Sequence, residues 1–338
     1  SVVWSSDGMS LYASGQHIGK GLNPVYRWKN QGRNEPEKIA LTQNRITEIQ
    51  QMPNNHIAFA AGDPGVGVMA PDGTLKSFRG PDIANFSRAQ KQLALSADAS
   101  VVRYPLSRDN RTQHSFAVFG GGDQNTANAP DKPVFAAILQ AKGIKVSDWA
   151  DSFKPKINGR TPLLEEYELS RCYAIAPDHK VVLLGTEWAV RLLRYDASEI
   201  WHIKLPAVAW SVNVSRNGHL AVAMLSDGTI RWYRMEDGRE VLAYFPHANG
   251  RDWIAWVPDG YYMSSIYGDN YIGWHLNRGK DLTPDFYRAV QFDRILYRQD
   301  IVTASFSAAL KPVTRSLETP LRGADFEIAR LRDIAPAR

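Results

Sequence analysis

The sequence contains a single cysteine, Cys172, among 338 residues. One thiol cannot form a disulfide within the chain, so packing and hydrogen bonds must hold the fold together. The sequence also lacks an apolar run of the roughly 18 residues that a membrane-spanning helix needs, and no membrane span is expected. Stability is therefore expected to come from a hydrophobic core, which the 44% hydrophobic content can supply.

No stretch of the chain concentrates charge of one sign. The 40 basic and 35 acidic residues give a formal net charge of +5, and they are spread along the whole sequence. A nucleic-acid-binding protein usually shows a basic stripe, so nucleic acid is not favoured as a partner.

Motifs for metal, phosphate and thiol chemistry are also missing. The eight histidines form no His-Glu-x-x-His pattern, and the Gly-rich strings GDPGVG and GGGD lack the Lys-Ser/Thr of a phosphate loop. Cys172 lies in SRCYAIAPD, an expected buried strand, and is interpreted as structural. The sequence predicts no catalytic residue, no metal site and no cofactor.

What the sequence does contain is a turn motif that recurs along the chain. Each copy has an apolar run, a turn built on Asp or Asn, and a second apolar run, as in VVWSSDGMSLYASG and SVNVSRNGHLAVAM. The turn residues are Asp7, Asn54, Asp98, Asp178, Asn217 and Asp259. A period of about 40–45 residues with four strands per unit is typical of a β-propeller blade.

The segment from Ser211 to Phe245 shows the repeat most clearly. It reads as four strands, SVNVS, LAVAML, TIRWYRM and REVLAYF, separated by turns that include two Asp-Gly pairs. Asp-Gly between β-rich runs predicts a hairpin, because such turns need positive φ.

The step from Asp98 to Asp178 is twice as long as the others. It holds either two blades, one degenerate, or one blade with an insertion. FAAILQAKGIKVSDW from Phe135 aligns loosely with a blade and favours the first reading, whereas the polar GGGDQNTANAPDKP favours a long loop. Seven blades are favoured, and six are the alternative.

The repeat stops after Arg278. The segment DLTPDFYRAVQFDRILYRQDIV predicts two short helices, with a helix start at Thr283–Pro284, and a last helix is expected near 324–332. The predicted fold is therefore all-β: a WD-repeat-like propeller over residues 1–279, followed by a short helical extension or linker over 280–338.

Much of the chain resembles bacterial WD-repeat proteins in which a propeller precedes a caspase-like peptidase domain. The matching strings include PLLEEYELSR, DGTIRWYRMEDGREVLAYFPHANGRDWIAWVPDGYYMSS and DFYRAVQFDRILYRQDIV. The Trp-Asp pair and the opening Gly-His of strict WD repeats are mostly absent. The resemblance implies that this chain is the propeller portion, with the peptidase domain fused or associated elsewhere.

The chain starts with Ser1 directly on a strand-like motif, so we expect it to be a trimmed piece. An upstream segment or a partner chain is then expected to close the propeller. The compartment is open: the cytoplasm is favoured, and the periplasm is the alternative because the N-terminus looks trimmed.

The last repeat is unusually dense in aromatic residues. Trp, Tyr and Arg dominate interface hot spots, so this cluster is the candidate interaction site, although core packing is expected to take about half of it. Its members are Arg251, Trp253, Trp256, Tyr261, Tyr262, Tyr267 and Tyr271. The irregular segments 103–114 and 120–133 are the expected partner-binding loops.

Two functions follow from these observations. The first is a non-catalytic scaffold, sensor or regulatory module that binds a protein partner or a fused caspase-like peptidase domain. The alternative is a hydrolase or lyase with its active site in the central channel of the propeller. The second needs clustered acids or histidines on the inner strands, and VVWS, LALS, YAIA, VNVS and WIAW carry none.

Overall fold

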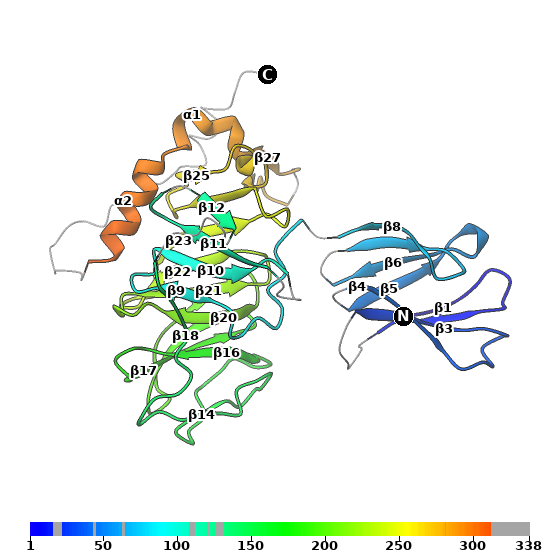
Figure 1. Cartoon of the computed structure of the whole chain (residues 1–338), viewed down its shortest axis with the longest axis horizontal. Coiled ribbons are helices and arrows are strands. Elements are labelled where there is room, and N and C mark those ends of the chain that lie inside the picture. Colours follow the sequence, from blue (N-terminus) through cyan, green and yellow to red (C-terminus); the bar gives the residue numbers. More distant parts are fainter. Residues whose placement is uncertain are drawn as a thin grey trace. The chain divides into compact units, whose positions relative to one another are not determined.

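The structure is a computed structural model that describes residues 1–15, 22–42, 45–62, 65–80, 82–107, 112–120, 122–125, 132–280 and 282–311. These residues form mainly antiparallel β-structure, arranged in two compact units, Ser1–Asp82 and Ile83–Arg338 (Figure 1). None of the helices in the described ranges is long and apolar enough to cross a membrane.

The first unit contains two four-stranded sheets in which strands adjacent in sequence pair antiparallel. The first sheet comprises β1 (Val2–Trp4), β2 (Leu11–Ala13), β3 (Asn23–Trp28) and β4 (Glu37–Thr42). The second comprises β5 (Ile46–Gln51), β6 (Ile57–Ala61), β7 (Val66–Met69) and β8 (Leu75–Arg79), with the short 3-10 helix η1 (Pro53–Asn55) before β6. Their shared core includes Tyr12, Val25, Ile49, Ile57 and Met69.

The second unit contains three larger sheets and two small ones. One has the order β12-β11-β10-β9-β13, with β9 (Ala94–Ser96), β10 (Val101–Pro105), β11 (Gln113–Ala117), β12 (Gly122–Asn125) and β13 (Val134–Ala136). A four-stranded sheet holds β16 (Ser170–Ile175), β17 (Val181–Thr186), β18 (Ala189–Arg194) and β19 (Glu199–Lys204). A six-stranded sheet holds β20 (Ala209–Val214), β21 (Leu220–Leu225), β22 (Ile230–Arg234), β23 (Glu240–Pro246), β24 (Trp253–Trp256) and β25 (Tyr262–Ser264).

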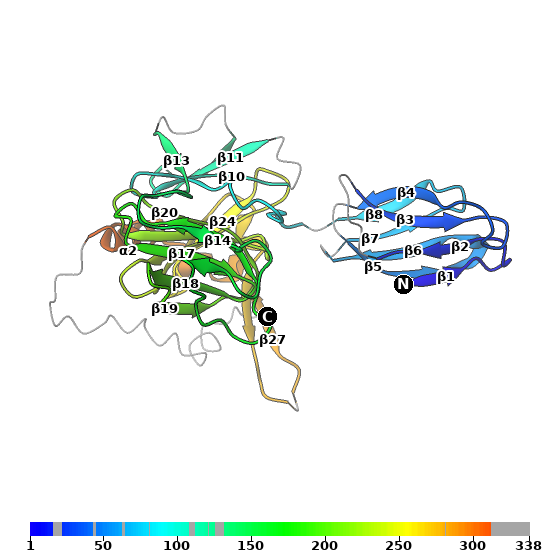
Figure 2. The same cartoon turned by 90° about the horizontal axis from the view of Figure 1, so that it is seen from below.

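The two small sheets have two strands each. They pair β14 (Val146–Ser147) with β15 (Lys156–Ile157), and β26 (Gly273–Leu276) with β27 (Asp285–Arg288). Figure 2 shows the β26–β27 ribbon extending away from the larger sheets of its unit.

The recurring turn motif has a shared hydrogen-bond network. In the β20–β21 turn the Ser215 hydroxyl donates to Asn217 Oδ1 (2.7 Å) and accepts from the Leu220 amide (2.9 Å), while Asn217 Oδ1 also accepts from the His219 amide (3.1 Å). The same Ser-x-Asp/Asn network occurs at Ser5–Asp7 and Ser96–Asp98. The repeated motif thus forms the same turn because a short polar side chain satisfies the backbone donors there.

The central sheet of the second unit is buried on both faces. Alternate residues of a strand point to opposite sides, and in β21 Leu220, Val222 and Met224 join the cluster shared with β9–β11. The intervening Ala221, Ala223 and Leu225 join the cluster shared with β16–β18. The two neighbouring sheets therefore cover the two faces of β20–β23.

Two repeat segments differ from the blade pattern. The copy that begins at Trp253 does not start a separate sheet: β24 pairs with β23, and the six strands are continuous. In the 80-residue step, β10–β13 join β9 in one five-stranded sheet and β14 pairs only with β15, so the described residues form no second four-stranded sheet there. The antiparallel sheets are consistent with propeller-like repeats. The number of blades and the end of the propeller at residue 279 remain predictions.

The C-terminal helices begin later than the sequence suggested. The expected start at Thr283–Pro284 is wrong, because residues 285–288 form β27 and hydrogen-bond to β26 instead. Among the described residues after β25, the helical elements are η3 (Gly268–Asn270), η4 (Ala289–Phe292), α1 (Asp293–Leu296) and α2 (Gln299–Ala309). Helix α2 buries Val302 and Phe306 against the β9–β11 and β20–β25 cluster. The helix expected at 324–332 lies outside the described residues.

Candidate interaction surface

Two loops of the second unit carry the exposed part of the aromatic cluster. One connects β23 to β24, and the other follows β25 and contains η3. They are joined closely: the Ser265 amide donates to the Trp253 carbonyl (3.0 Å), and the Trp253 amide donates to Ser265 Oγ (3.0 Å). A Cβ at Gly268 would lie 1.8 Å from the Trp253 carbonyl oxygen, so only glycine permits this approach.

The β23–β24 loop is held by its own side chains. Asn249 Oδ1 accepts from the amides of Arg251 and Asp252, both at 3.0 Å, and the Asn249 amide donates to His247 Nδ1 (3.2 Å). The hydrogen bond from the Asn249 backbone N–H to Nδ1 fixes the orientation of the His247 ring. The loop is therefore shaped before any partner arrives.

The second loop is fixed onto the first by an aromatic stack. The rings of His247 and Tyr271 lie 4.0 Å apart at an interplanar angle of 28°, and the Tyr271 hydroxyl donates to Asp252 Oδ2 (3.3 Å). The stack leaves Tyr271 41% exposed while it covers His247. An exposed aromatic ring held in one orientation loses little entropy when a partner binds.

The structure divides the seven predicted site residues between core and surface. Trp253 and Tyr262 are buried, at 6% and 1% exposure, and Trp256 and Tyr261 are partly buried. Arg251, Tyr267 and Tyr271 are exposed, Tyr267 to 66%. Their role in binding stays a prediction.

The buried members have packing and hydrogen-bonding roles. The Trp253 ring lies 5.4 Å from that of Phe116, and the Tyr262 hydroxyl donates to the Ala289 carbonyl (3.1 Å). Burial raises the pKa of the Tyr262 hydroxyl, and the nearby carboxylate of Asp269 adds to the shift. Tyr262 thus remains a neutral hydroxyl that joins β25 to the start of η4.

Sequence reasoning missed Ile266, which is 87% exposed between Ser265 and Tyr267. The available signal was a large aliphatic residue in a loop directly after a strand. We name the exposed set Arg251, Ile266, Tyr267 and Tyr271 the Tyr267 patch. It combines an aliphatic side chain, two aromatic rings and a guanidinium on two anchored loops.

The two expected partner-binding loops are partly strand. In 103–114, residues up to Pro105 belong to β10 and those from Gln113 belong to β11. In 120–133, β12 occupies Gly122–Asn125. The polar composition was wrongly taken for loop there, because strands that pair at the edge of a sheet tolerate polar side chains. Residues 108–111, 121 and 126–131 lie outside the described residues.

The chemistry of the remaining candidates is limited. Across the described ranges, no group of three or more His, Cys, Asp or Glu side chains is arranged to hold a metal ion. The thiol of Cys172 is buried, its Sγ lies 3.4 Å from the Ala209 carbonyl, and burial raises its pKa. The interpretation of Cys172 as a buried strand residue is confirmed.

Asp269, behind the Tyr267 patch, is a buried carboxyl in η3. Burial raises its pKa, and Asp293 adds to the shift. The side-chain amide of Asn270 donates to Asp269 Oδ1 (3.4 Å). The group lies beneath the loop rather than on the surface that a partner could contact.

No family model matches the chain. No curated protein matches it either. Among solved structures it is similar to the C-terminal WD40 domain of Sif2, at 10% identity and a TM-score of 0.24, covering 79% of this chain and 66% of that one. It is also similar to the computationally designed protein Ika8, at 15% identity and a TM-score of 0.28, covering 76% and 82%. TM-scores at this level do not establish a shared fold.

Proposed function

We propose that this chain is a non-catalytic protein-interaction scaffold, and that its partner is a caspase-like peptidase domain, fused or associated. The Tyr267 patch is the observation that supports the scaffold role. Tyr, Trp and Arg are the residue types that most often contribute the largest share of binding energy at protein interfaces. The peptidase as the partner rests on the sequence resemblance alone.

The construction of the patch favours recognition over packing. Ile266 and Tyr267 expose most of their surface, whereas the residues beneath them, Trp253 and Tyr262, are fixed in the core. Rigid elements that present apolar side chains on loops are a common arrangement for binding sites. A partner that covers the patch would remove this apolar surface from water.

A pull-down with the full chain as bait tests this proposal. The wild-type chain should retain a specific partner from the source cell extract, identified by mass spectrometry, and Ile266→Ser with Tyr267→Ser should lose at least about tenfold of it. The matched control is Tyr195→Ser, because Tyr195 is also highly exposed, on the β18–β19 turn of the same unit.

Three results are informative. Loss of the partner only in the double variant supports the scaffold, and identification of a caspase-like peptidase supports the finer proposal. Equal retention by the double variant and the wild type would exclude the Tyr267 patch as the binding surface. Circular dichroism and thermal melting of each bait confirm that the variants are folded.

A further inference from the structure

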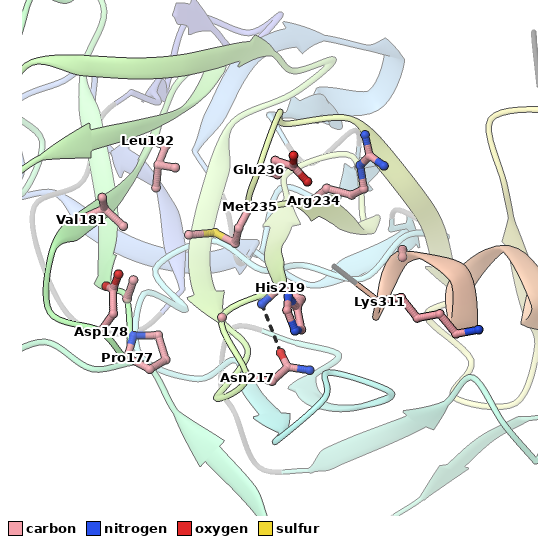
Figure 3. A pocket seen from close by; sticks show the side chains of 13 residues that line it. Pro177, Asp178, Val181, Leu192, Asn217, His219, Arg234, Met235, Glu236 and Lys311 are labelled. Carbon is pink, nitrogen blue, oxygen red and sulfur yellow. Dashed lines mark hydrogen bonds between the residues drawn. The ribbon is translucent and has the colours of Figure 1, made fainter. Parts of the chain in front are cut away.

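A concave site separate from the Tyr267 patch lies between two neighbouring sheets of the second unit. It is a cavity of about 420 Å³ at the turn ends of β16–β19 and β20–β25 (Figure 3). Its walls come from the β16–β17, β20–β21 and β22–β23 turns, from β18 and from the end of α2. The volume falls in the range typical of ligand sites, about 300–1,000 Å³.

One side of the cavity is apolar. Val181, Leu192 and Met235 form this side, and Figure 3 shows the Met235 thioether directed toward Val181. Leu192 belongs to the buried cluster beneath, while Val181 and Met235 pack on that cluster with part of their surface accessible. A flexible methionine on such a wall adapts to an alkyl chain.

Four charged side chains line the cavity: the carboxylates of Asp178 and Glu236, and the cations of Arg234 and Lys311. Asp178 and Glu236 make no ion pair within the described ranges, and Asp178 Oδ1 accepts only the Lys180 amide (3.0 Å). Arg234 is neutralised by Asp237, to which its Nε donates (3.0 Å) alongside a second contact from its guanidinium. Figure 3 shows the Lys311 ammonium far from Asp178, on the opposite side of His219.

We propose that this cavity binds a lysine or arginine side chain of a partner peptide. The alkyl part of such a side chain would lie on Val181, Leu192 and Met235, and its cation would lie beside Asp178, with Glu236 adding to the negative field. Lys and Arg commonly bury their stem while the head stays in a polar surrounding. An anion fits poorly because the unpaired charges nearest the apolar wall are negative.

The inference rests on the proposed scaffold function, since the side chain would belong to a protein partner. It concerns a different surface from the Tyr267 patch. A titration with a small probe separates the two, because the probe needs no partner protein.

The probe is N-acetyl-L-arginine methylamide, added to the full chain labelled with ¹³C at its six methionine methyl groups. The Met235 signal, assigned by its loss in Met235→Leu, should shift and saturate at millimolar probe. N-acetyl-L-citrulline methylamide has nearly the same shape without the charge, and it should bind at least about threefold more weakly, as expected for an exposed ion pair.

Asp178→Asn is the decisive variant. Asparagine keeps the side-chain oxygen that accepts from the Lys180 amide, so the turn is retained while the charge is lost. Arginine affinity should fall about threefold to fivefold, to the citrulline level. The control Asp72→Asn makes the same change in a turn of the first unit, where Asp72 accepts the Thr74 amide, and should change nothing.

Three outcomes would overturn the proposal: no shift of Met235 with the arginine probe, equal shifts with arginine and citrulline, or an unchanged arginine affinity in Asp178→Asn. The other five methionine signals report whether each variant is folded, and Glu236→Gln replaces Asp178→Asn if the latter is not. The Ile266→Ser, Tyr267→Ser chain should titrate as the wild type. A pull-down that contradicts the scaffold proposal would therefore leave the titration result unchanged. A titration that shows no binding would likewise leave the pull-down result unchanged.

Discussion

Two sheets built on the same antiparallel pattern differ in how many of their faces are covered. Within the first unit, sheet β5–β8 packs one face onto β1–β4, and β6 alternates between buried and partly buried residues. Within the second unit, β21 is buried at every position because a sheet lies on each side.

The difference shows that the strand pairing within a sheet does not determine how many of its faces are buried. The sheets that pack against it do. Two cross-strand rows form the less covered face of β5–β8: Glu48–Ala60–Val66–Arg79 and Gln50–Ala58–Val68–Ser77. Small apolar residues in the middle and polar residues at the ends suit a half-covered surface. In β20–β23, by contrast, the rows Ser211–Met224–Ile230–Tyr244 and Asn213–Val222–Trp232–Leu242 are buried along their whole length.

The largest loss of stability is expected for Trp232→Ala in β22, which lies in the sheet that is covered on both faces. The Trp232 ring is fully buried beside Phe116, and its Nε1 donates to the Ala99 carbonyl (2.9 Å), which joins two sheets. We expect the free energy of unfolding of this unit to fall by about 3–5 kcal/mol. Hydrogen exchange resolved by strand measures it. A cost below about 1 kcal/mol would contradict the two-faced core.

The next largest effect is expected for Glu168→Gln. Glu168 is fully buried and receives hydrogen bonds from Arg191 Nε (2.9 Å), Arg191 Nη2 (2.6 Å) and Thr186 Oγ1 (2.6 Å). Removing its charge leaves Arg191 buried with less compensation, at a cost of about 3 kcal/mol. The control is Glu37→Gln in the first unit, since the partner of Arg27 is well exposed and should cost less than about 1 kcal/mol.

Glu168 also predicts a pH dependence. Burial alone would raise its pKa, but the hydrogen bonds from Arg191 and Thr186 outweigh burial and hold the pKa below the ordinary value of 4.5. The stabilisation is then fully present above pH 4.5 and is lost as the pH falls through the lowered pKa of the folded state. Urea unfolding at pH 7 and at pH 3 measures this effect. The free energy of unfolding should fall less between the two pH values in Glu168→Gln than in the wild type.

The hydroxyl of the shared turn should contribute less to stability than Glu168 does, and it should contribute the same amount in both units. Ser215→Ala in the second unit and Ser5→Ala in the first each remove a hydroxyl that makes the same two bonds. Each should destabilise its own unit by about 1 kcal/mol. Unequal costs, measured by exchange at the two turns, would show that burial of the sheet and not the local turn sets the energy.

The smallest effect is expected for Val66→Ala on the less covered face. Val66 is 54% exposed in β7, so truncation should change stability by less than about 0.5 kcal/mol. The matched change Val222→Ala, in fully buried β21, should cost about 2 kcal/mol. Similar values for the two valines would remove the distinction between the sheets.

The local features were predictable from sequence and the long-range ones were not. Asp7, Asp98 and Asn217 marked true turns, because a side chain that bonds its own backbone needs only neighbours in sequence. The strands beside them followed from apolar and β-branched runs. The joining of β24 to β23 depends on which surfaces meet in three dimensions, and a repeat pattern does not contain that information.

The candidate site shows the same limit. Aromatic density between Trp253 and Tyr271 indicated the right region, yet the sequence could not separate buried Tyr262 from exposed Tyr267. That separation depends on η3 and on the approach of Gly268 to the Trp253 carbonyl. Ile266 was missed because an aliphatic residue in sequence looks the same whether it faces the core or solvent.

The pairing of β24 with β23 has a consequence for self-association. Strand β23 reads EVLAYFP and carries a single charge, so an unpaired edge there would attract strands of other chains. The hydrogen bonds from Ala243–Pro246 to Trp253–Trp256 occupy that edge. Pairing with β24 therefore protects the chain against fibre formation at this strand. A second copy of the chain finds no free backbone N–H or C=O groups along Ala243–Pro246 to pair with.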